Sequence, residues 1–339
     1  MISKVLSNKI YYATFTLAIF VIAIHVSYVD YLNPAVVGYD FSFFIQRFFI
    51  VIGDASVPTF FVISGYLLFS KFTLKGYPKM LLNKVFSLTI PYFFWSILAF
   101  LIMQIIYPLI LGGTINLTFK SAIINILMSE DCKHLWFVRT LLVFFICSPL
   151  LYFIFKYLKK WSIVIPIVLF FVNLLYRPEY SGILYWIPLF FVGSYLAYFN
   201  VSFTSKIQSK VVSISVLLAF IFLALVFTIN HTEYEDNSYY FYRFASPLLV
   251  WVSLDLFSPL FKKEKVREIF KFSAFIFFSH LFVVTAFKQL FQLWISVDSN
   301  YHCALLFFLV LIFASILDIS IAYLLKRSAK PVYKLCGGR

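Results

Sequence analysis

The chain has 339 residues, of which 63% are hydrophobic and 22% aromatic, while only 12% are charged. A soluble domain is closer to half apolar and a quarter charged, so these side chains could not cover a globular surface with polar groups. The composition excludes a cytosolic enzyme, a disordered protein and a secreted disulfide scaffold. It predicts a polytopic helical membrane protein.

Apolar runs of about 20 residues, the length that crosses the hydrocarbon of a bilayer, recur along the whole chain. The first run follows Lys4 and Lys9, as a signal peptide would, but no small-residue cleavage site follows it, so we expect a retained first span. No linker separates the runs, and we expect one all-α integral-membrane domain over residues 1–339. The predicted spans, about ten, are 10–29, 48–70, 85–111, 135–155, 161–176, 183–200, 211–229, 239–260, 268–290 and 302–325.

The net charge of +14 comes from 28 Lys and Arg against 14 Asp and Glu. In a soluble chain this excess would suggest nucleic acid, but cytoplasmic loops of membrane proteins accumulate Lys and Arg, so we expect a bilayer and no nucleic acid. With both termini cytoplasmic, the basic residues that fall outside are Arg47, Lys120, Lys133, Arg139, Arg177, Arg243 and Lys288. The acidic residues that fall outside are Asp30, Asp40, Glu130, Asp131, Glu179, Glu233, Glu235, Asp236 and Asp298.

His25 is the sharpest candidate for chemistry, because ionisable groups inside spans are costly to bury. It lies about 24 Å from Lys9 at the helical rise, in the outer half of the first span. An imidazole can take a hydroxyl proton near neutral pH, which suits a general base. The alternative is a histidine hydrogen-bonded between packed helices or one at the membrane interface.

Two more histidines have both a functional and a structural interpretation. His280 lies near the middle of the ninth predicted span, where a polar contact between helices is at least as expected as a direct role. His134 opens the fourth span beside Trp136 and Arg139. His231 and His302 fall in outer loops, where exposed histidines are common.

Arg47 and Asp54 are seven residues apart, about two turns, and lie on nearly one helix face. They either pair through neighbours, frame a polar cavity, or belong to a solvated segment. Asp255 and Asp318 are expected to be structural, neutralised by Lys262 or Lys326.

Aromatic residues at the outer span ends are typical of an interfacial belt, which we favour over a sugar-stacking surface. They are Tyr28, Tyr31, Tyr39, Tyr176, Tyr180, Tyr185, Trp186, Tyr239, Tyr240, Tyr242, Trp294 and Tyr301. No glycine-rich phosphate loop, nucleophile elbow or metal-ligand cluster is present in the sequence, so we expect no metal and no bound cofactor.

Four stretches together resemble the bacterial membrane acyltransferase 3 family. Residues 57–68, VPTFFVISGYLL, look like its F-F-x-x-S-G segment, and residues 90–96, IPYFFWS, look like its I-P-Y-x-x-W-S segment. Residues 134–137, HLWF, resemble its H-L-W-F segment, and Phe278-Ser279-His280 resembles a late aromatic-x-x-His. Their order and spacing cover essentially the full chain.

The resemblance implies a multi-pass bacterial plasma-membrane enzyme that transfers an acyl group from acyl-CoA, with acetyl-CoA expected, to a hydroxyl of an extracytoplasmic acceptor. The expected acceptor is a glycan or a lipid-linked saccharide. His25 matches the family's catalytic histidine, which stands there as general base. The implied substrate-binding residues are His134, Trp136, Arg139, Arg47, Ser64, Lys84 and His280.

The sequence departs from the family at the basic positions thought to engage acyl-CoA. Thr14 stands where the family has an arginine, and Ser87 stands where a second arginine is frequent. Lys9, Lys79 and Lys84 could replace these charges, although lysine lacks the bidentate guanidinium fork. The alternative functions are a polysaccharide flippase or exporter, or a relative that has lost catalysis.

Overall fold

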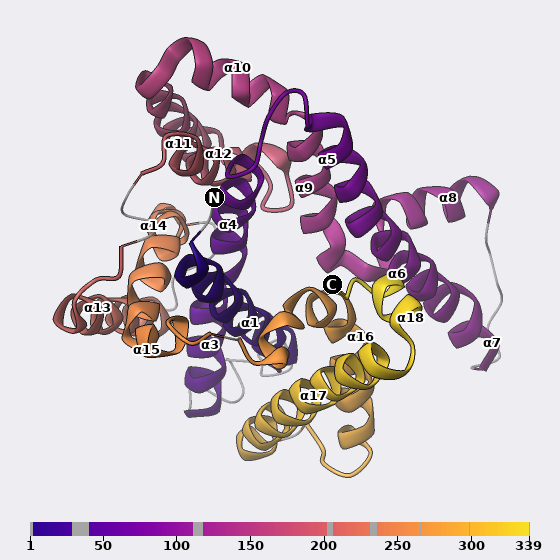
Figure 1. Ribbon diagram of the computed structural model, residues 1–339. Helices are drawn as coiled ribbons and strands as arrows, with labels where there is room; N and C mark the ends of the chain where they lie inside the picture. The colour runs from indigo at the N-terminus through magenta and orange to yellow at the C-terminus, as the bar shows by residue number, and fades with distance from the viewer. Residues whose placement is uncertain are drawn as a thin grey trace.

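The computed structural model describes residues 3–28, 41–110, 118–201, 206–230, 236–264, 266–297 and 299–338 (Figure 1). These residues form helices and connecting turns and contain no β-strand, which confirms the all-α fold. The α-helices are α1 (Lys4–Val26), α3 (Phe41–Gly53), α4 (Ser56–Phe69), α5 (Tyr77–Lys84), α6 (Ile90–Phe100), α7 (Tyr107–Ile110), α8 (Phe119–Met128), α9 (Trp136–Ile146), α10 (Ser148–Leu158), α11 (Val164–Tyr176), α12 (Ile183–Tyr198), α13 (Lys210–Ile229), α14 (Asn237–Ser253), α15 (Ser258–Phe261), α16 (Ser273–Gln292), α17 (Asn300–Ser328) and α18 (Lys330–Leu335).

Eight helical stretches among the described residues are long and apolar enough to cross a membrane, which confirms a multi-pass membrane protein. The sequence predicted about ten spans, and the difference lies between residues 135 and 200. There α12 is only 16 residues long, and α10 and α11 count as one stretch, Ser148–Tyr176. A positive φ of 51° at Lys159 nevertheless ends α10 and separates it from α11.

The third stretch, Tyr77–Ile110, is one long helix with two π-helical segments, Val85–Thr89 and Leu101–Ile106. Each π segment precedes a proline in the first turn of the next α-helical segment, Pro91 in α6 and Pro108 in α7. Proline has no N–H for the bond to residue i−4, so wider hydrogen-bonded turns let the helix continue past it.

A close helix contact joins α4 to α12 through two glycines, Gly65 and Gly193. A Cβ placed on Gly193 would lie 2.0 Å from the Val62 carbonyl oxygen, and one on Gly65 would lie 2.3 Å from the Phe190 carbonyl oxygen. The two backbones therefore touch with no side chain between them, as small residues allow in membrane helices.

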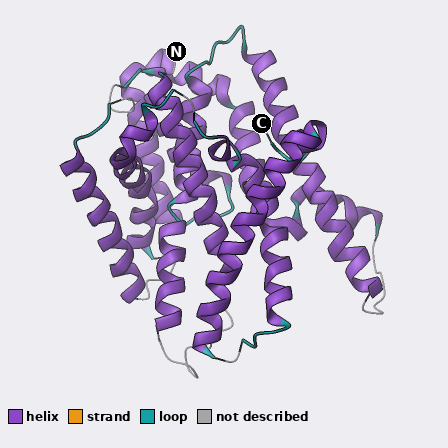
Figure 2. Ribbon diagram, turned by 60° about the horizontal axis from the view of Figure 1, so that its bottom comes forward, coloured by secondary structure: helices purple, strands orange, loops and turns teal. Residues whose placement is uncertain are grey.

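Both chain ends lie at the same end of the bundle (Figure 2). The Asn8 amide near the start of α1 donates to the carbonyl oxygens of Phe261 (2.8 Å) and Lys263 (3.0 Å), just beyond α14. Lys326 near the end of α17 pairs with Glu268 at 3.1 Å. These contacts gather the segments that the charge pattern predicted on one side of the membrane.

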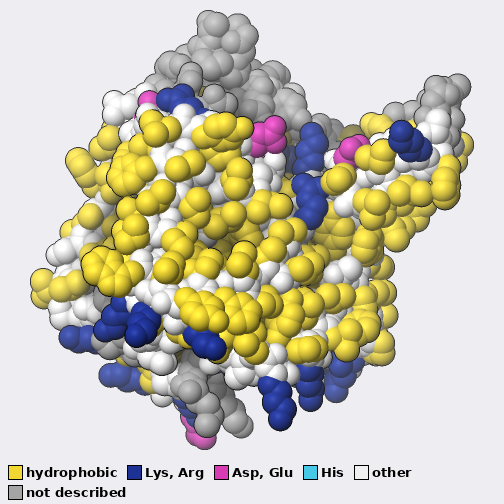
Figure 3. Space-filling view, turned by 90° about the horizontal axis from the view of Figure 1, so that it is seen from above, with side chains coloured by type: hydrophobic (Ala, Val, Ile, Leu, Met, Phe, Trp, Pro, Cys, Tyr) yellow, Lys and Arg dark blue, Asp and Glu magenta, His cyan; other side chains and the backbone are white. Residues whose placement is uncertain are grey.

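The outer surface matches a bilayer environment. Figure 3 shows a broad hydrophobic face, with mainly Lys and Arg side chains along the lower edge and a mixture of acidic and basic side chains toward the upper edge. Of the acidic residues predicted outside, Asp30, Asp40, Glu233, Glu235 and Asp298 lie beyond the described residues, as do His231, Tyr31 and Tyr39.

The predicted aromatic belt is only partly right. Tyr176, Trp294 and Tyr301 are exposed, as a belt requires. Most of the others are buried inside the bundle, namely Tyr28, Tyr185, Trp186, Tyr239, Tyr240 and Tyr242. The pattern of rings at span ends is the same in both cases, so it could not separate a lipid-facing ring from one turned inward.

We expect Gly193→Leu to lower the thermal unfolding midpoint of the detergent-solubilised protein. The added side chain must separate α4 from α12, and overpacking of this kind costs about 1–3 kcal/mol. Gly76→Leu is the matched control, because there a Cβ meets the Thr73 hydroxyl at 2.8 Å, which can rotate away. Equal midpoints for the two variants would contradict the close α4–α12 contact.

Candidate active site

Three histidines from distant parts of the sequence meet inside the bundle. His25 comes from the last turn of α1, His134 from the 3₁₀ turn Glu130–Leu135 before α9, and His280 from α16. The ring centroid of His280 lies 5.1 Å from that of His25 and 4.7 Å from that of His134. His25 and His134 are 6.3 Å apart.

His280 is fully buried and its tautomer is fixed by its own helix. Its Nδ1 lies 2.8 Å from the Phe277 carbonyl oxygen and 3.1 Å from that of Ile276. A carbonyl oxygen only accepts, so Nδ1 carries the proton and Nε2 keeps a lone pair. Nε2 has no hydrogen-bond partner among the described residues.

His134 is held by a neighbouring thiol. The Cys132 Sγ lies 3.6 Å from His134 Nδ1. Burial, and then the nearby Asp131 carboxylate, raises the pKa of Cys132 to about 12, so a thiol rather than a thiolate faces the imidazole. Burial also lowers the pKa of His134 to about 3, so its ring is neutral and Nδ1 can accept.

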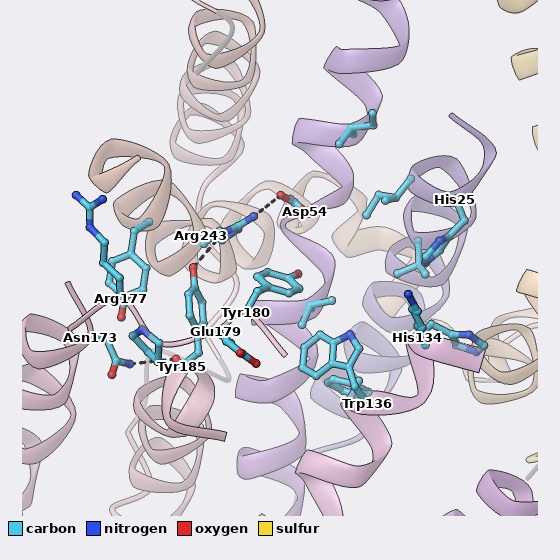
Figure 4. Close-up of a pocket in the computed structure, with 18 of the residues that line it drawn as sticks. His25, Asp54, His134, Trp136, Asn173, Arg177, Glu179, Tyr180, Tyr185 and Arg243 are labelled. Carbon is cyan, nitrogen blue, oxygen red and sulfur yellow. Dashed lines mark hydrogen bonds and ion pairs between the residues drawn. The ribbon is translucent and has the colours of Figure 1, made fainter. Parts of the chain in front are cut away.

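His25 and His134 line one end of a cavity of about 720 Å³. Figure 4 shows these two rings on one side and Arg243 on the other, with Trp136 and Tyr180 between them. The exposed side chains of Lys133, Arg177, Glu179 and Asn237 also belong to the lining. His280 contacts the rings of His25 and His134 but does not line the cavity.

The opposite end of the cavity is built around a buried ion pair. The Arg243 guanidinium, from α14, donates to Asp54 Oδ2 at 3.1 Å and to the Tyr185 hydroxyl at 3.1 Å. The Tyr239 hydroxyl donates to the same Asp54 oxygen at 2.8 Å. The guanidinium carbon also lies 4.6 Å from the centroid of the Tyr180 ring and 4.7 Å from that of Tyr239.

The structure places the predicted site residues in two groups. His25, His134 and His280 cluster, and Trp136 lines the cavity next to them. The other four, Arg47, Ser64, Lys84 and Arg139, do not belong to its lining.

Arg139 and Lys84 contact other parts of the bundle. Arg139 donates to the carbonyl oxygen of Met128 at 3.2 Å and contacts its sulfur at 3.1 Å. Lys84 lies 5.2 Å from the Phe145 ring centroid. Of the predicted Arg47 and Asp54 pair, only Asp54 frames a polar cavity, and its partner is Arg243.

Arg243 is the main functional candidate that the sequence did not single out. It was counted as an outer-loop charge, although it stands within the apolar stretch 239–260. That position inside a predicted span was the available signal, because a buried arginine needs a partner. Nothing in the spacing indicated that the partner would be Asp54, nearly two hundred positions earlier.

Two predicted charge partners are wrong. Asp255 pairs with Lys9 at 2.7 Å rather than with Lys262, and both side chains are buried. Asp318 accepts a hydrogen bond from the Ser279 hydroxyl at 2.6 Å, while Lys326 pairs with Glu268. Lys9 is therefore committed to an internal ion pair and does not replace the family's arginine.

The position of that arginine is occupied by a neutral hydroxyl contact. The Thr14 hydroxyl donates to the Ile10 carbonyl oxygen at 2.9 Å and accepts from the Ser273 hydroxyl at 3.3 Å. Ser273 begins α16, so this contact joins α1 to the helix that carries His280.

The described residues contain no candidate metal site. Among the described residues, no set of three or more His, Cys, Asp or Glu side chains has an arrangement that could hold a metal ion.

Comparison with protein families identifies the class of protein. The model of the acyltransferase 3 family, described as an acyltransferase domain, matches residues 12–326. The match covers most of the chain, and the protein belongs to this family of membrane proteins. No curated protein and no solved structure gives a significant match.

We expect Ser279→Ala to reduce the free energy of unfolding by about 1–3 kcal/mol, because it removes a hydrogen bond to a buried carboxyl group. The measurement is thermal or denaturant unfolding in detergent. Ser315→Ala is the control, since the Ser315 hydroxyl bonds the Leu311 carbonyl oxygen of its own helix α17 at 2.7 Å. Equal stability of both variants would show that the Ser279–Asp318 contact contributes nothing.

Proposed function

We propose that the protein transfers an acyl group from acyl-CoA to a hydroxyl of an extracytoplasmic glycan or lipid-linked saccharide. The observation that carries the proposal is the meeting of His25, His134 and His280 at one end of a cavity. Family membership supports acyl transfer as the reaction class.

In this proposal His25 is the general base. His25 lines the cavity, and it is half-buried whereas the other two histidines are buried, so an acceptor hydroxyl can reach it. His25 takes the hydroxyl proton as the oxygen attacks the thioester carbonyl. The carbon–sulfur bond then breaks, and the proton passes to the leaving CoA thiolate.

His134 and His280 support this step from two sides. His134 lies on the same wall and is neutral, so it can orient the acceptor. His280 is locked by its backbone contacts and presents Nε2 inside the cluster. The fixed ring behind His25 limits the rotamers available to the base.

Acyl-CoA is the proposed co-substrate, and the basic residues of one membrane face would attract its phosphates. The neutral contact at Thr14 supports weaker donor binding than in relatives that carry the arginine. The competing function is saccharide export by a flippase-like protein, which needs no acyl donor. Turnover of labelled acetyl-CoA by the purified protein separates the two.

We expect His25→Ala to lower the rate of acyl transfer about 10²- to 10⁴-fold, the usual contribution of a general base. The measurement is release of CoA and labelling of envelope glycans by membranes that contain equal amounts of each protein.

His302→Ala is the matched control, because His302 is exposed in the first turn of α17, away from the cavity. Undiminished transfer by His25→Ala would exclude His25 as the base. Absence of turnover in the unaltered protein, together with saccharide export, would favour the transporter.

We expect Thr14→Arg to lower the KM for acetyl-CoA about tenfold by adding a charge-assisted, bidentate donor for phosphate. Thr14→Gln is the control of similar polarity without the charge. A KM equal to that of Thr14→Gln would mean that the side chain at position 14 does not contact acetyl-CoA.

A further inference from the structure

The end of the cavity opposite His25 carries a charged cluster that the chemistry of acyl transfer does not use. Four elements supply it: Asp54 between α3 and α4, Arg243 of α14, Tyr185 of α12 and Tyr180 of the preceding turn. Arg243 and Tyr185 are only 5% and 6% exposed, yet both reach the cavity wall.

We propose that Arg243, Asp54 and Tyr185 form a second subsite, which takes a neutral sugar unit of the acceptor through two adjacent hydroxyl groups. The inference rests on the proposed function. It places the reacting hydroxyl at His25 and the recognised sugar unit at the other end of the same cavity.

Stability alone does not account for this cluster. The hydration that both charged groups lose cancels much of the attraction within a buried ion pair. Apolar side chains of similar volume frequently stabilise a protein equally well. Another buried ion pair among the described residues, Lys9–Asp255, is not part of the cavity lining, and the centroid of the Trp251 ring lies 4.1 Å from Lys9 Nζ. Arg243–Asp54 instead stands where a ligand can meet it.

The chemistry of the pair favours a neutral ligand with paired hydroxyls. A guanidinium offers N–H donors directly beside carboxylate and phenol oxygens, and each sugar hydroxyl both donates and accepts. An acidic ligand gains little, because Asp54 already balances the charge of Arg243 at 3.1 Å. The lining has one positive charge in excess, but this charge lies among the exposed side chains of Lys133, Arg177 and Glu179 and not at the buried Arg243–Asp54 pair.

The aromatic side chains between the two ends suit the same ligand. Trp136 and Tyr180 both line the cavity, and their ring centroids are 5.4 Å apart. Ring faces of this kind cover the apolar face of a pyranose, while the polar groups fix its orientation. A volume of about 720 Å³ exceeds what a single reacting hydroxyl needs.

The test is saturable binding of defined glycosides to the full-length protein in detergent, measured by calorimetry without acyl-CoA. The probes are methyl mannopyranoside, its permethylated derivative, which keeps the ring but lacks hydroxyl donors, and methyl glucuronoside, which carries a carboxylate. We expect the neutral glycoside to bind more tightly than the other two. Arg243→Gln and Asp54→Asn should each weaken its binding about tenfold or more.

Asp255→Asn is the matched control, because it alters a buried ion pair of the same kind outside the cavity. It should leave glycoside binding unchanged. Tyr185→Phe removes a single hydroxyl and keeps the ring, so it can test the subsite if Arg243→Gln and Asp54→Asn do not fold. We expect it to weaken glycoside binding as well.

The subsite is overturned if Tyr185→Phe binds the glycoside as tightly as the unaltered protein and the Asp255→Asn control do. It is also overturned if glucuronoside binds best, or if no probe binds. Turnover of acetyl-CoA measured on the same preparation separates this outcome from failure of the proposed function. Turnover without glycoside binding rejects the subsite alone. Arg243-dependent binding without turnover keeps the subsite and rejects the transferase.

Discussion

A polar group inside a bilayer has no water to bind, so its partner must come from the protein itself. This constraint organises the bundle. Lys9 pairs with Asp255 and Arg243 with Asp54, which joins segments far apart in the sequence, and Ser279 bonds Asp318, which joins the consecutive helices α16 and α17. The contacts fix which helix faces which and place both walls of the cavity.

The histidine cluster is a place where this constraint is relaxed. His280 satisfies Nδ1 with backbone carbonyls of its own helix, yet its Nε2 has no partner in the part of the chain that the structure describes. A buried group that lacks a partner is costly and is expected where chemistry needs it.

Hydrophobicity and charge pattern predicted the all-α bundle and the placement of both chain ends on one side of the membrane, because both follow from the bilayer and hold for each segment independently. His25, His134 and Trp136 were predicted from motifs and do line the cavity. The partners of Asp255, Asp318 and Asp54 were not predictable, since they depend on which helices become neighbours. Short helices between Trp136 and Tyr198 were also hard to count, because one φ at Lys159 decides where a span ends.

The glycine contact between α4 and α12 has a consequence for how the cavity can change shape. Asp54 lies immediately before α4 and Tyr185 lies in the first turn of α12, so both are attached to helices that touch through backbone atoms. Such a pair cannot slide without a clash, and it acts as one rigid wall. Widening of the cavity would therefore have to come from the opposite wall, which the 3₁₀ turn with His134 and the end of α1 with His25 provide. If the protein acts as proposed, a change of that wall to fit a larger acceptor would also shift the base.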